Sequence, residues 1–161
     1  MVDYAAAVRA RAVFADMESL AGLLALVLTA VALAPGAAHV LELPNKLKLP
    51  REDYLLVQKL YRGWAYLGIE IAAALGCTLW FAAVAEGPAE APAVIAFVAV
   101  LATQLVFWVF TFPVNRYTRN WRDAPSEDWR RLRDRWELSH AVSALLNFIA
   151  LVCVAVAILL S

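Results

Sequence analysis

The sequence predicts an all-α protein, an integral membrane four-helix bundle with interfacial helical extensions at one end. Of its 161 residues, 63% are hydrophobic and the mean hydropathy is +0.67, whereas soluble globular domains are about 45–50% apolar. Apolar runs fall near residues 20–41, 64–84, 93–112 and 138–160. Each is close to the ~20 residues that cross a hydrocarbon core as a helix. We therefore expect one domain over residues 1–161, with four spans.

The charge pattern predicts the orientation. Of the 14 Lys and Arg residues, twelve lie between the first and second runs or between the third and fourth. The positive-inside bias then places both long loops in the cytoplasm and both termini outside. The arginines of the second loop alternate with Asp and Glu, so we expect contact with the lipid bilayer and no nucleic-acid binding.

Proline and acidic residues predict the first elements. Residues 1–18 suit a short interfacial helix that precedes the first span. Pro35 is expected to kink that span, and Pro44 to end it, with His39 and Glu42 in the last turn. Residues 43–53 then read as a surface loop. A new helix is expected near residues 52–53, running unbroken into the second span.

The later elements follow from the same signals. The stretch 86–92 is predicted to be a compact turn, and the third helix to end at Phe112-Pro113, with residues 116–124 irregular. Pro125 and Ser126 are expected to open the last helix, because Ser is a good N-cap. That helix carries Trp129 and Trp136 at helical spacing and descends through His140.

Polar side chains gather at the ends of the spans that carry the long loops. Because lipid-facing polar groups are costly, we expect the polar stripes of the helices to face one another. Glu70 lies well inside the second span, where an unpaired carboxylate costs several kcal/mol. It is therefore predicted to be hydrogen-bonded to Gln104, Asn147 or Tyr66, or to act as a ligand or proton carrier.

The two histidines, His39 and His140, are expected at the same end of the bundle. Two imidazoles and a carboxylate from Glu42 or Glu70 match the ligand set that leaves open positions on non-haem iron. A single transition metal, iron or copper, is thus one prediction. Haem held by both histidines is the rival, with Arg62, Arg116 or Arg119 pairing to propionates. The plain alternative is that the histidines cap helices or bond loop carbonyls.

Several motifs together resemble a family. These are Gly36-x-x-His39-x-x-Glu42-x-Pro44-Asn45-Lys46, Gln58-x-x-Tyr61-Arg62-Gly63-Trp64, Phe107-Trp108, Phe112-Pro113-x-Asn115, Asn120-Trp121 and Arg135-Trp136-Glu137-x-Ser139-His140. They are similar to a bacterial four-helix membrane family of unknown function that is anthrone-oxygenase-like. The resemblance implies the bacterial inner membrane, and marks as motif positions His39, Glu42, Asn115, Trp121 and His140. Distant relatives insert oxygen into polycyclic phenolic anthrones.

The sequence therefore predicts a membrane oxygenase or oxidoreductase acting on a hydrophobic aromatic or quinone-like small molecule. The histidines would hold the metal, Tyr61, Arg62, Asn115 and Glu70 would act in catalysis, and Arg62, Arg116 and Trp121 would contact a cofactor. An oxygenase without metal, using a base to make a substrate carbanion, is also compatible with these residues. The alternative from another class is a non-catalytic subunit of a larger membrane complex, or a small-molecule or haem binder. A homo-oligomer is compatible with either of these functions.

Overall fold

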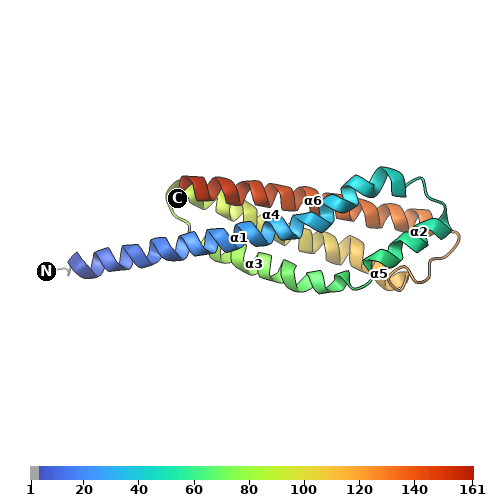
Figure 1. The fold of residues 1–161 in the computed structure, drawn as a ribbon, viewed down its shortest axis with the longest axis horizontal. Helices are drawn as coiled ribbons and strands as arrows, with labels where there is room; N and C mark the ends of the chain where they lie inside the picture. Colours follow the sequence, from blue (N-terminus) through green and yellow to red (C-terminus); the bar gives the residue numbers. More distant parts are fainter. Residues whose placement is uncertain (1–3) are drawn as a thin grey trace.

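The bundle is built from four long helices. The computed structural model describes residues 4–161, with side chains from Ala12 onward, and this part of the chain contains helices and turns but no strand. The long helices are α1 (Tyr4–Lys46), α3 (Leu67–Val84), α4 (Glu90–Val106) and α6 (Trp129–Leu160), and they run along one axis (Figure 1). Four helical segments are long and apolar enough to cross a membrane. The chain is thus a multi-pass membrane protein, as predicted.

The two ends of the bundle differ in the connections that they carry. The short helices α2 (Arg51–Val57) and α5 (Phe112–Tyr117) lie at one end, together with the two long connections (Figure 1). We call this the basic end, because residues 46–62 and 116–135 contain twelve of the chain's 14 Lys and Arg residues. The turn between α3 and α4 and the last residues of α6 lie at the opposite end.

The first helix differs from the prediction, because α1 is continuous from Tyr4 to Lys46 and includes both Pro35 and Pro44. Residues 4–18 therefore belong to the same helix as the first span, and residues 1–3 lie outside the described part. A proline inside a membrane helix is tolerated when neighbouring groups satisfy the carbonyls that it frees. Pro35 frees the carbonyl of Val31, and the Asn147 amide donates to the next carbonyl, that of Ala32, at 3.4 Å. The continuation beyond Pro44 carries Lys46 into the bundle.

The entry into the second span is also different. The helix α2 carries Glu52 and Asp53 in its first turn, as predicted, but it ends at Val57. Two 3-10 turns follow, Gln58–Tyr61 and Trp64–Tyr66. Gly63 separates them with a φ of 94°, a value that side chains other than glycine rarely adopt. The predicted unbroken helix is therefore wrong, and the break turns Tyr61 and Trp64 toward His39.

The third span runs farther than predicted. A π-helical turn, Phe107–Thr111, joins α4 to α5, so the helical path passes Pro113 and ends at Tyr117. Residues 119–121 then take positive φ values of 51°, 55° and 59°. This tight turn is held by the Asn120 amide, which donates to the Asn115 carbonyl at 2.7 Å, and by the Trp121 amide, which donates to Thr118 Oγ1 at 3.1 Å. The last helix begins at Trp129 and not at Ser126.

The membrane part of the core is packed mainly with alanine. Its buried residues are Ala21, Ala25, Phe81, Ala85, Ala89, Ala93, Ala96, Ala99, Val100, Ala150, Val154 and Ala157. Small residues let helix backbones approach closely where lipid offers no hydrophobic drive for association. The helices α1 and α6 approach closely at Gly36, where a Cβ would lie 3.1 Å from the Ala144 Cβ and 3.2 Å from its Cα.

This contact gives a first prediction. Gly36→Ala forces α1 away from the α6 backbone, and we expect it to lower the free energy of unfolding by about 1–3 kcal/mol, as overpacking does. The matched control is Gly76→Ala, because a Cβ at Gly76 meets nothing within 4 Å. Unfolding in mixed micelles with increasing sodium dodecyl sulfate measures both. Equal stability of the two variants would contradict the close packing at Gly36.

Candidate functional site

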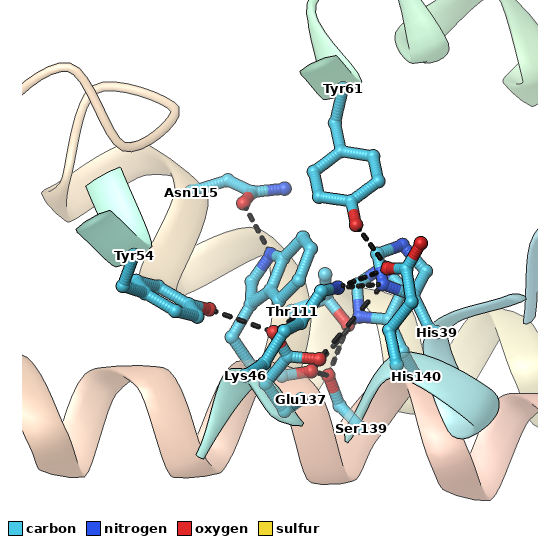
Figure 2. Close-up of polar contacts among 11 residues, drawn as sticks. His39, Lys46, Tyr54, Tyr61, Thr111, Asn115, Glu137, Ser139 and His140 are labelled. Atoms are coloured by element: carbon cyan, nitrogen blue, oxygen red, sulfur yellow. Dashed lines mark hydrogen bonds and ion pairs between the residues drawn. The ribbon is translucent and has the colours of Figure 1, made fainter. Parts of the chain in front are cut away.

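The site lies at the basic end, between the last turns of α1 and the first half of α6. Because α1 continues through Pro44, His39, Glu42 and Lys46 fall on one face of the helix at spacings of three and four residues. The helix α6 contributes Glu137 and His140, which are one turn apart. Figure 2 shows the side chains of His39, Lys46, Glu137 and His140 pointing toward one another.

The centre of the site is the ammonium group of Lys46, which is only 3% exposed. It donates to His39 Nδ1 at 2.9 Å and lies 2.9 Å from Glu42 Oε2 and 3.5 Å from Glu137 Oε1. It also lies 4.6 Å from the centroid of the Tyr61 ring, within the range of a cation–π interaction. An ammonium has three N–H donors, and three acceptors surround this one.

Glu137 is the most deeply buried acid of the site, at 1% exposure. Its Oε1 accepts a hydrogen bond from the Tyr54 hydroxyl at 3.0 Å, whereas its Oε2 has no hydrogen-bond partner among the described residues and lies 3.9 Å from His39 Nδ1. Burial, followed by the negative charge of Glu137, raises the pKa of the Tyr54 hydroxyl above the usual tyrosine range. Tyr54 therefore stays a hydrogen-bond donor to this carboxylate.

A second tyrosine binds the outer carboxylate. The Tyr61 hydroxyl donates to Glu42 Oε2 at 2.5 Å, and the Glu42 side chain is 49% exposed. Burial and this hydrogen bond raise the pKa of Tyr61. The site thus extends from a buried carboxylate, through the ammonium, to a carboxylate that faces outward.

The two histidine rings are in contact, with centroids 4.5 Å apart. An ammonium can only donate, so His39 Nδ1 must accept from Lys46 and the proton of the neutral ring is on Nε2. A carbonyl oxygen can only accept, so His140 Nδ1, 2.9 Å from the Trp136 carbonyl, must carry a proton. The neutral His140 ring then keeps its lone pair on Nε2. The hydrogen bonds therefore assign opposite tautomers to the two rings.

An apolar groove lies next to this site, between α1 and the start of α3. It has a volume of about 580 Å³ and is lined by Val31, Ala34, Pro35, Ala38, Gly63, Trp64, Tyr66 and Leu67. Trp64 links it to the site, because its ring meets His39 edge-on with centroids 5.8 Å apart and meets Tyr61 at 4.9 Å. One side chain is therefore both a wall of the groove and a neighbour of the histidine pair.

Of the residues predicted for the site, His39, His140, Glu42 and Tyr61 come together, and Asn115 supports them from outside. The Asn115 side-chain carbonyl accepts from Trp136 Nε1 at 2.8 Å, and the Trp136 ring stacks on His140 at 4.1 Å. Trp121 is buried in an aromatic cluster next to the site, where it packs on Tyr54 at 5.1 Å and on Trp136 at 6.0 Å. Arg62, Arg116 and Arg119 are exposed and make none of the side-chain contacts of this site.

Glu70 is not part of this cluster. Both of its carboxylate oxygens are buried and have no hydrogen-bond partner among the described residues. Its predicted partners bond elsewhere: the Gln104 amide donates to Thr103 Oγ1, and the Asn147 amide to the carbonyl of Ala32.

The residues do not fit the predicted metal or haem. Among residues 4–161, no group of three or more His, Cys, Asp or Glu side chains could hold a metal ion. The Lys46 ammonium lies between His39, Glu42 and Glu137. It supplies the positive charge that a metal ion would otherwise bring to these ligand atoms. Haem ligation by both histidines needs the macrocycle between the rings, and rings with centroids 4.5 Å apart leave no room for it.

Sequence reasoning missed Lys46 and gave Glu137 no role in the site. The signal for Lys46 was its position, four residues after Glu42 and seven after His39, which is one face of a continuous helix. Ending the helix at Pro44 assigned Lys46 to a loop. Glu137 precedes His140 by one turn, so the same spacing rule indicated it.

No family model matches the chain, and neither a curated protein nor a solved structure matches it. The resemblance to anthrone-oxygenase-like membrane proteins therefore remains a prediction.

The buried charges give a second prediction. Lys46→Met leaves Glu137 without its nearby cation, and breaking a buried ion pair in this way costs about 3–5 kcal/mol of unfolding free energy. The double variant Lys46→Met with Glu137→Gln removes both charges, so we expect it to recover most of that loss. The control is Lys48→Met, which changes an exposed lysine. If Lys46→Met costs no more than Lys48→Met, the ammonium does not hold the site together.

Proposed function

We propose that this protein is a membrane-embedded oxygenase that takes a hydrophobic aromatic or quinone-like molecule from the bilayer and uses its histidine pair to move a proton. The observation that carries this proposal is the contact between His39 and His140 in opposite tautomers. Trp64, which contacts His39, also lines the apolar groove.

The tautomers give the two histidines different roles. The lone pair on His140 Nε2 suits a general base, and the N–H on His39 Nε2 suits a hydrogen-bond donor or acid. Neutral imidazole is the usual proton acceptor in enzymes that work near neutral pH. The pair can therefore remove a proton from a carbon or oxygen acid while it donates a hydrogen bond to the oxygen where negative charge develops.

The charges next to the histidine pair are of both signs. One ammonium, Lys46, faces two carboxylates, Glu42 and Glu137. When both acids are ionised, Lys46, Glu42 and Glu137 together carry one net negative charge. The two carboxylates favour a proton on the histidine pair, whereas the nearby Lys46 ammonium opposes it.

Dioxygen is the oxidant in the proposed reaction. The base removes a proton from an activated CH₂ group between two aromatic rings, and the carbanion passes one electron to dioxygen. The resulting radical and superoxide combine, with a proton, to a hydroperoxide, which loses water to leave a carbonyl group. In total, CH₂ and O₂ give C=O and H₂O, with no further reductant. The motifs that resemble those of anthrone-oxygenase-like proteins favour the same substrate class.

The test uses anthrone as the probe with the protein in lipid nanodiscs. We expect oxygen uptake with one equivalent of anthraquinone formed, and a slower reaction when the CH₂ group carries deuterium. His140→Gln removes the base and is expected to lower the rate about 10²–10⁴-fold, the usual contribution of a general base. Circular dichroism checks that the variant keeps its helices.

Three outcomes would contradict the proposal in different ways. If His140→Gln turns over anthrone as fast as the wild-type protein, His140 is not the base. Loss of activity on treatment with a chelator, restored by iron or copper, would show a metal-dependent reaction. We expect no effect of a chelator, because Lys46 lies between His39, Glu42 and Glu137. Binding of anthrone without any turnover would favour the non-catalytic binding protein.

A further inference from the structure

Tyr61 connects a wall of the apolar groove to an outward-facing carboxylate. Its ring lies 4.9 Å from the Trp64 ring, centroid to centroid, and Trp64 lines the groove and is 38% exposed. The Tyr61 hydroxyl donates to Glu42 Oε2 at 2.5 Å. The same oxygen lies 2.9 Å from the Lys46 ammonium, which favours the ionised form of the acid. Tyr61 therefore has an aromatic neighbour on one side and a base on the other.

This arrangement suits the loss of one electron from Tyr61. Tryptophan and tyrosine give up an electron more readily than phenylalanine or histidine, and the Trp64 and Tyr61 rings are close enough for direct transfer. A phenol that loses an electron becomes a very strong acid, so a hydrogen-bonded base makes its oxidation easier. The product is a neutral tyrosyl radical. No new positive charge then arises beside Lys46, whose ammonium lies 4.6 Å from the Tyr61 ring centroid.

Another tyrosine of the groove lacks such a base. Tyr66 also lines the groove and is 80% exposed. Among the described residues, the hydroxyls of Tyr54 and Tyr61 donate to carboxylates, and that of Tyr66 does not. Exposure alone would direct oxidation to Tyr66, whereas a base at the hydroxyl directs it to Tyr61. The two tyrosines thus form a matched pair for an experiment.

We propose that Tyr61, through Trp64, donates one electron to radicals that form in the groove. The inference rests on the proposed function, in which a substrate radical arises next to dioxygen. A substrate radical that escapes from superoxide adds dioxygen and becomes a peroxyl radical, which is a one-electron oxidant.

The electrons and protons of this step balance. Trp64 gives one electron to the peroxyl radical, which takes a proton from water and becomes a hydroperoxide. Trp64 regains an electron from Tyr61, whose phenolic proton passes to Glu42 and from there to water, because Glu42 is 49% exposed. In total, a peroxyl radical and the Tyr61 phenol give a hydroperoxide and a tyrosyl radical. A water-soluble one-electron reductant of the ascorbate class returns the radical to the phenol.

The test generates the oxidant chemically, without anthrone. The full-length protein is placed in nanodiscs of saturated lipid with a lipid-soluble azo initiator under air, which releases alkyl peroxyl radicals into the bilayer. Electron paramagnetic resonance of freeze-quenched samples is expected to show a tyrosyl radical, which narrows when the protein carries ring-deuterated tyrosine. Ascorbate in the buffer should remove the signal. Tyr61→Phe keeps the ring that packs on His39 and should abolish the signal, whereas Tyr66→Phe should keep it.

Two further variants separate the base from the electron path. Glu42→Gln keeps a hydrogen-bond acceptor but not a base, and we expect it to slow radical formation about 10²-fold, the lower end of the usual contribution of a positioned base. Trp64→Phe keeps an aromatic wall that is hard to oxidise, so it should also lower the rate. Circular dichroism checks that each variant keeps its helices.

The possible failures are distinguishable. If Tyr61→Phe keeps the signal and Tyr66→Phe loses it, oxidation follows exposure and the inference is overturned. An unchanged rate in Glu42→Gln overturns it as well, because the carboxylate then takes no proton. If the initiator produces the Tyr61 radical but anthrone is not oxidised, the electron donor stands and the proposed function fails. If anthrone is oxidised but the initiator produces no tyrosyl radical, the proposed function stands and this inference fails.

Discussion

The site depends on one buried cation. The Lys46 ammonium holds Glu42 on its own helix, Glu137 on α6 and the ring of His39 at the same time. Removing a lysine from water is expensive unless each N–H finds an acceptor and the charge finds partners. Here both conditions are met, and the last turns of α1 are thereby fastened to α6. The tautomer of His39, and through it the chemistry of the histidine pair, follows from this arrangement.

Some parts of this protein were predictable from sequence, and the place of Lys46 was not. The fold class and the four spans follow from hydropathy, because a hydrocarbon core sets the length of each helix. The meeting of His39 and His140 follows from the position of polar residues at one end of the spans. Pro44 was misleading: propensity ends a helix there, but tertiary contacts extend α1 to Lys46. Since Lys46 was assigned to a loop, the predicted site lacked its central cation.

Glu70 shows another limit of sequence reasoning. Its depth was predictable from position, but its expected partners were chosen by the rule that buried polar groups pair with one another. Asn147 instead bonds the Ala32 carbonyl next to the Pro35 distortion, and Gln104 bonds Thr103 on its own helix. The result is an alanine-packed bundle in which Glu70 has no hydrogen-bond partner among the described residues.

The central claim is that Lys46 fixes the histidines as neutral rings in opposite tautomers. The chain has two histidines, so nitrogen NMR of protein labelled with ¹⁵N-histidine reports both rings, and a single His140→Gln variant assigns them. At neutral pH the account predicts one ring protonated on Nε2, His39, and one protonated on Nδ1, His140. Two rings with the same tautomer, or a doubly protonated His39, would contradict it.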